Sequence, residues 1–179
     1  SYQRGLTDWS DAIEPLRHNL TGESSRIVRL AAAHALVALD ARESADSLFR
    51  QSRQDGLEMA QIVEPALARW DYRPIRPVWR ERLSQLHEGQ RYRLLAIRGL
   101  GTVRDPESAD ALTKIATDPL GAATLRIAAG ESLGRIRTQG LESAADRLNR
   151  DQAAMIDRLV AAKLLRHHES DAAQRLLVD

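Results

Sequence analysis

The chain has 179 residues, carries 26 basic against 25 acidic side chains and contains no cysteine. The missing cysteines exclude disulfides, thiolate metal sites and a cysteine nucleophile, and a net charge of +1 is small for a protein that follows a nucleic-acid backbone. Alanine and leucine dominate while aromatic residues make up only 4%, which favours closely packed helices in one domain or a short repeat array.

The chain alternates between shorter and longer predicted helices, and each shorter helix forms a hairpin with the longer helix that follows. Apolar residues recur at helical spacing in both kinds, and glycine or proline separates them. The shorter, first helices are expected at 9–20, 43–53, 75–86, 107–117, 142–150 and 171–178. The longer, second helices are expected at 25–39, 57–70, 90–104, 121–137 and 152–167.

A leucine stands at the same place in every second helix, in similar sequence contexts and 31 to 33 residues after the previous one. These anchor leucines are Leu36, Leu67, Leu100, Leu133 and Leu165. The second copy departs from the others, because Ala60 replaces an arginine found in the other four and Pro65 stands inside the helix. Since proline removes a backbone donor, we expect Pro65 to kink or break that helix.

Self-similarity with this period, and no convincing alternation of period two, predicts an all-α solenoid of about five helical hairpins plus a terminal helix. We expect residues 1–179 to form a single repeat domain. The last helix, 171–178, has no second helix after it and ends in apolar residues, and the chain begins with Ser1. We therefore expect the chain to be a fragment of a longer protein.

The repeated strings resemble HEAT repeats, especially the short bacterial kind called PBS-lyase HEAT-like repeats. Residues 28–36 read VRLAAAHAL, residues 93–105 read RLLAIRGLGTVRD and residues 125–136 read LRIAAGESLGRI. The resemblance implies that the repeated arginine pairs with an acid at the start of its own helix or in the preceding turn, as a structural ladder. The arginines are Arg29, Arg93, Arg126 and Arg158, and the corresponding acids are Glu23, Glu88, Asp118 and Asp151.

Motifs for catalysis or metal binding are not convincing in this sequence. It has no Gly-x-Ser-x-Gly elbow, glycine-rich phosphate loop or His-Glu-x-x-His pair. The pairs His87-Glu88 and His168-Glu169 resemble the iron ligands of deoxyhypusine hydroxylase, a HEAT-repeat enzyme, but they stand at different places in their repeats. The sequence therefore predicts no catalytic residue, metal or cofactor.

Residues 70–80 concentrate tryptophan, tyrosine and arginine, which are enriched in interface hot spots. Trp70 and Trp79 align with core positions of other repeats and are expected to be buried. Tyr72, Arg73 and Arg76 have no such explanation and are candidates for a contact surface.

In HEAT-like arrays the second helices line the concave face, so the resemblance implies a binding row two residues before and after each anchor leucine. The charged candidates in this row are Arg69, Arg98, Glu131, Arg135 and Lys163. With one acid among them, we expect a mildly basic stripe, and a merely solvated face is the alternative.

The favoured function is a non-catalytic scaffold that binds a protein or peptide, with a preference for acidic segments. The alternative is nucleic-acid binding, since some DNA glycosylases hold DNA with HEAT repeats, although the charge balance disfavours it. A third possibility is a chromophore-lyase-type enzyme, for which no bilin pocket is evident. No apolar run approaches the length of a membrane span, and the lack of cysteine suits a reducing cytosol while leaving secretion open.

Overall fold

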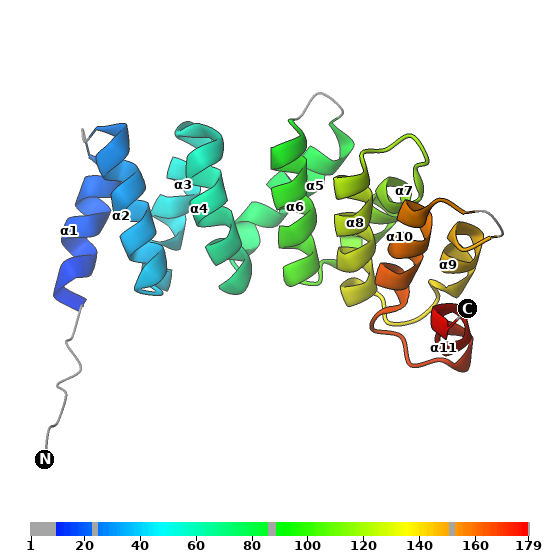
Figure 1. Ribbon diagram of the computed structural model, residues 1–179. Helices are drawn as coiled ribbons and strands as arrows, with labels where there is room; N and C mark the ends of the chain where they lie inside the picture. The colour runs from blue at the N-terminus through cyan, green and yellow to red at the C-terminus, as the bar shows by residue number, and fades with distance from the viewer. Residues whose placement is uncertain (1–9, 23–24, 86–88, 151–152, 179) are drawn as a thin grey trace, which may run out of the picture. The chain divides into compact units, whose positions relative to one another are not determined.

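The computed structural model describes residues 10–22, 25–85, 89–150 and 153–178. These residues form helices joined by turns, and none of them lies in a strand (Figure 1). The chain divides into two compact units, of which unit 1 ends at Tyr72 and unit 2 begins at Arg73.

Unit 1 contains two helical hairpins, α1 with α2 and α3 with α4, and the second helices of the two hairpins also pack together. A short 3-10 turn, η1, leads into α3. The bounds are α1 Ser10–Thr21, α2 Arg26–Ala38, η1 Arg42–Ser44, α3 Ala45–Gln54 and α4 Gly56–Arg69.

Unit 2 contains three further hairpins and the last helix, α11, which contacts both α9 and α10. The second helices of these hairpins, α6, α8 and α10, lie side by side (Figure 1). The bounds are η2 Arg73–Ile75, α5 Arg76–Ser84, α6 Gln90–Thr102, η3 Pro106–Ser108, α7 Ala109–Thr117, α8 Ala123–Ile136, α9 Glu142–Leu148, α10 Met155–Leu165 and α11 Asp171–Val178.

The observed helices start and end within three residues of the expected bounds. Each first helix packs against the second helix that follows it, and adjacent second helices stack within each unit. The expected all-α fold of stacked helical hairpins is therefore confirmed. The single domain 1–179 remains a prediction.

The anchor leucines lie at the centre of each hairpin. Four of the five are completely buried and Leu165 is almost so, and burying a leucine side chain contributes about 1.5–3 kcal/mol. Alanines fill the neighbouring buried positions, such as Ala32 beside Leu36 and Ala129 beside Leu133. Small side chains at these positions let adjacent helices come close.

Pro65 does not break its helix, contrary to the prediction of a possible break. Helix α4 runs without interruption from Gly56 to Arg69. Pro65 and Gln61, whose carbonyl loses the usual hydrogen bond to residue 65, are both exposed. Water can therefore satisfy that carbonyl, which lowers the cost of proline at this position.

Serines stand immediately before several helices and behave in two ways. Ser170 accepts a hydrogen bond from the Ala173 amide and so caps α11. Ser44 and Ser108 precede α3 and α7 but make no side-chain cap bond. Each ends a 3-10 turn, and the Ser108 hydroxyl instead donates back to the Asp105 carbonyl.

Helices α6, α8 and α10 approach one another at small residues. The Ser132 hydroxyl of α8 donates to the Ile97 carbonyl of α6 over 2.9 Å, and a Cβ on Gly101 would lie 2.4 Å from that hydroxyl oxygen. A Cβ on Gly134 would lie 2.7 Å from the Lys163 carbonyl oxygen of α10. Larger residues at either glycine would force the helices apart.

Candidate functional site

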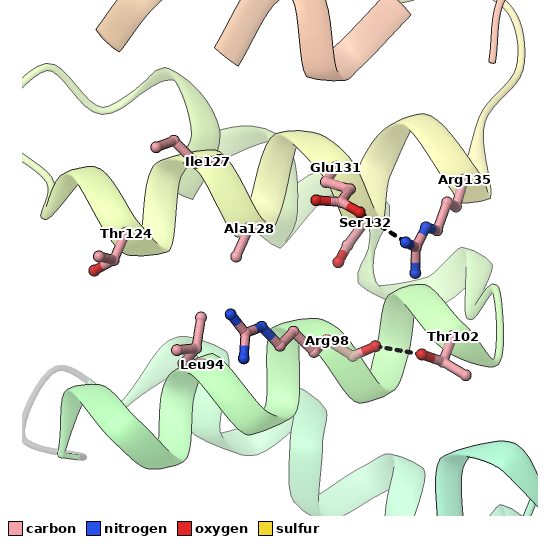
Figure 2. Close-up of a pocket in the computed structure, with 9 residues that line it drawn as sticks. All are labelled: Leu94, Arg98, Thr102, Thr124, Ile127, Ala128, Glu131, Ser132 and Arg135. Atoms are coloured by element: carbon pink, nitrogen blue, oxygen red, sulfur yellow. Dashed lines mark hydrogen bonds and ion pairs between the residues drawn. The ribbon is translucent and has the colours of Figure 1, made fainter. Parts of the chain in front are cut away.

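An open groove lies between α6 and α8 on the face formed by the second helices of unit 2. It has a volume of about 520 Å³, within the range of small binding pockets. Figure 2 shows that the lining side chains come from both helices, and that Leu94 and Arg98 of α6 point toward α8. They are Leu94, Arg98 and Thr102 of α6, and Thr124, Ile127, Ala128, Glu131, Ser132 and Arg135 of α8.

The charged residues of the groove are not equivalent. Glu131 forms ion pairs with Arg135 at 2.7 Å and with Lys163 of α10 at 3.6 Å. Arg98 is exposed and forms no ion pair with any acid among the described residues. The Arg98 backbone carbonyl accepts a hydrogen bond from the Thr102 hydroxyl, whereas its guanidinium bonds to none of the described residues. The Arg98 guanidinium is therefore available to an incoming acceptor.

Four of the five predicted row residues, Arg98, Glu131, Arg135 and Lys163, thus lie together on the second helices of unit 2. The fifth, Arg69, is exposed at the end of α4 in unit 1. Its charge contributes to lowering the pKa of Asp40, although the main cause is the hydrogen bond that Asp40 accepts from the Trp70 indole.

The two tryptophans that were expected to be buried differ. Trp70 is only half-buried, whereas Trp79 is completely buried as predicted.

The other predicted contact residues have different surroundings. Tyr72 packs against the Phe49 ring and donates its hydroxyl to Asp46, and burial with this hydrogen bond raises the pKa of Tyr72 to about 12. Arg76 is half-buried, with its guanidinium 3.8 Å from the buried Asp105 carboxylate. Arg73 is exposed at the start of η2. Of these three, Arg73 is the side chain most open to a partner.

Two of the predicted ladder arginines reach forward to the next hairpin. Arg29 of α2 donates two hydrogen bonds, of 2.7 and 2.9 Å, to Asp55 at the start of α4, and these bonds lower the pKa of Asp55. Arg126 of α8 is buried and donates to Asp157 of α10 and to the Ala116 carbonyl. The predicted pairing of Arg126 with Asp118 is wrong, since Asp157 lies closer once α8 and α10 stack.

The other two ladder arginines show no such pair. Arg93 is half-buried, and its Nε has no hydrogen-bond partner among the described residues. Arg158 is exposed on α10 and pairs with no acid in the part of the chain that the structure describes. Three of the predicted partners, Glu23, Glu88 and Asp151, lie outside the described residues, as does His87. A ladder role for Arg93 and Arg158 remains a prediction.

A buried histidine connects α9 to the segment before α11. His168 Nε2 lies 3.1 Å from the Arg137 carbonyl oxygen, and Nδ1 lies 3.3 Å from Glu142 Oε1. Glu142 also accepts from the Ser170 hydroxyl. Its own backbone amide, Ser170 and His168 together lower the pKa of Glu142 to about 2. The ionised carboxylate of Glu142 is therefore the form that makes these contacts with His168 and Ser170.

The lowered pKa predicts a pH dependence of stability at Glu142. Its contribution should be complete above the ordinary value of 4.5 and should be lost as the pH falls toward about 2. We expect Glu142→Gln to lower the melting temperature near pH 6, and the difference from the wild type to shrink as the pH falls through that window. Thermal melts from pH 2 to pH 6 measure this. Glu169→Gln is the matched control, because Glu169 is exposed. A difference that stays constant over the whole range would contradict the prediction.

Sequence reasoning missed the uncharged part of the groove. Leu94 and Ile127 stand six residues before the anchors Leu100 and Leu133, and the same repeat position is Leu159 in α10. All three are partly exposed. This regular apolar position was a signal in the sequence that could have located the groove lining.

Stacked helical hairpins with a groove between neighbouring second helices define a helical-repeat protein. A family model described as HEAT repeats matches residues 76–166, about half of the chain. The chain belongs to the HEAT-repeat family. No curated protein matches it.

None of the described helices is both long enough and apolar enough to cross a membrane. Within the same residues, no three histidine or acidic side chains cluster in a way that could hold a metal ion.

Proposed function

We propose that the chain is a non-catalytic interaction scaffold that binds a protein or peptide segment in the groove between α6 and α8. HEAT repeats generally serve as scaffolds for protein interactions. The observation that carries the proposal is Arg98, an exposed cation of the groove without an acidic partner among the described residues. The other charged residues of the lining, Glu131 and Arg135, pair with each other. A carboxylate of the partner can form a charge-assisted hydrogen bond there.

The charge of the groove supports a peptide over a nucleic acid. Glu131 lies on the same face as Arg98, Arg135 and Lys163 and forms ion pairs with two of them. A phosphate backbone would meet this carboxylate at close range, and phosphate binding usually needs a clear excess of cations. Recognition of a single acidic side chain needs only Arg98.

Charge reversal at Arg98 tests the proposal. Random dodecapeptides displayed on phage are selected on the purified chain, and the affinities of the enriched peptides are measured by fluorescence polarisation. Arg98→Glu should weaken binding at least tenfold, because a hydrogen bond to a charged group contributes about 1.5–3 kcal/mol and the new carboxylate adds repulsion.

Arg91→Glu is the matched control, since Arg91 is also an exposed residue of α6 but does not line the groove. Equal affinities for the wild type and Arg98→Glu would refute the proposed site. Tight binding of a DNA duplex with a steep salt dependence would instead favour the nucleic-acid alternative.

A further inference from the structure

In the groove, the apolar side chain of Leu94 lies beside the cationic side chain of Arg98. Leu94 and Arg98 are four residues apart on α6, so their backbone positions differ by about 6 Å along the helix axis. Figure 2 shows both side chains projecting toward α8. Ala128 of α8 points toward Leu94 and Arg98, and Ile127 belongs to the lining from the side of α8 that faces away from α6. An apolar side chain of a partner can therefore contact Leu94 and Ala128 while a neighbouring carboxylate reaches Arg98.

The close packing of α6 against α8 suits an extended partner better than a helical one. The hydrogen bond from Ser132 to Ile97 and the absence of a side chain at Gly101 hold α6 and α8 in close contact beneath it. A helix with side chains is about 10–12 Å across, whereas an extended chain is slimmer and can insert individual side chains. In an extended chain, residues i and i+2 face the same side about 6.6–6.8 Å apart, which matches the separation of Leu94 and Arg98.

Glu131 limits how acidic the bound segment can be. Its carboxylate is fixed on the α10 side by Arg135 and Lys163, and the three charges form one local network. A second acid of the partner on that side would meet Glu131 at close range, since like charges in proximity repel. The groove therefore favours one carboxylate beside an apolar residue over a run of acids.

We propose that the groove between α6 and α8 selects an extended peptide segment in which an apolar side chain stands two positions from a single aspartate or glutamate. This inference rests on the proposed function and specifies the partner of the same groove. The apolar residue packs on Leu94 and Ala128, and the carboxylate accepts hydrogen bonds from the Arg98 guanidinium.

The peptides enriched from the dodecapeptide library test this inference. We expect them to share Leu, Ile, Val or Phe two positions from Asp or Glu. Leu94→Ser should weaken their binding about tenfold, as the loss of part of a leucine contact predicts. Leu120→Ser should leave it unchanged, because Leu120 is an exposed leucine that does not line the groove. Circular dichroism of each variant checks that the helices are retained.

The possible outcomes separate the two proposals. Peptides that depend on Arg98 but lack the apolar–x–acid pattern, or that bind Leu94→Ser as well as the wild type, would overturn this inference alone. Enrichment of acidic runs, or of an apolar residue three or four positions from the acid, would do the same. Peptides that bind without Arg98, or a library that yields no binders, would overturn the proposed function and this inference with it.

Discussion

Replacing Trp79 with alanine should lower the free energy of unfolding by about 3–5 kcal/mol, the range for removal of a fully buried large aromatic side chain. Trp79 is completely buried in α5, and its ring lies against Gly99 of α6, where an added Cβ would come within 2.7 Å of a ring carbon. Urea unfolding followed by circular dichroism measures the effect. Trp79→Phe retains a ring and should lose much less. A loss below about 1 kcal/mol for the alanine variant would show that the site collapses around the gap.

The contact between Trp79 and Gly99 also predicts the result of a compensating change. The equivalent repeat positions hold Leu48 and Ala66 in one hairpin and Leu112 and Ser132 in another. The sequence thus combines a large residue with glycine here and a medium-sized residue with a small one elsewhere. Trp79→Leu combined with Gly99→Ala should therefore lose less stability than the sum of the two single substitutions.

Replacing Asp157 with alanine should also lower the free energy of unfolding strongly, by about 3–5 kcal/mol, because it leaves the charge of Arg126 buried without its partner. Arg126 is only 3% exposed, and in Asp157→Ala it would keep only the Ala116 carbonyl. The double variant Arg126→Met with Asp157→Ala removes both charges and should recover much of the loss. Chemical unfolding of the four proteins in this cycle gives the coupling between the two residues directly.

An exposed ion pair provides the control for this cycle. Arg137 and Asp110 pair at 3.2 Å, but both side chains are largely exposed to solvent. Asp110→Ala should therefore change stability by no more than about 1 kcal/mol. If Asp157→Ala cost no more than Asp110→Ala, the buried pair would not be a major stabilising contact.

The sequence was sufficient to predict the helices because each repeat contains the same local signals. These signals are the anchor leucine, the small residues beside it and the glycine or proline between helices. Because each acts over only a few residues, its effect can be predicted from the sequence alone. Pro65 was the exception, since its cost depends on whether the carbonyl it leaves unpaired faces water. A serine before a helix is likewise not sufficient for a cap, since Ser44 and Ser108 end 3-10 turns and make no side-chain cap bond.

The candidate site was predicted in part. The repeat positions of Arg98, Glu131, Arg135 and Lys163 predicted a common face, and the structure has these residues on the second helices of unit 2. Their role in binding remains a prediction. The sequence could not show which charges pair, because the partners belong to different hairpins. Arg126 and Asp157, for example, are separated by 31 residues. Only the register between α8 and α10 explains why Arg126 pairs with Asp157 and not with Asp118, which is nearer in the sequence.

The small residues between the second helices of unit 2 have a consequence for the kinetics of recognition. Gly134 of α8 lies directly against the backbone of α10, and Ser132 of α8 is hydrogen-bonded to α6. The distance from α8 to either neighbouring helix therefore cannot change without losing one of these contacts. The groove should then keep its shape whether or not it is occupied. A peptide would associate in a single step, with little ordering cost on the protein side, and differences in affinity would appear mainly as differences in residence time.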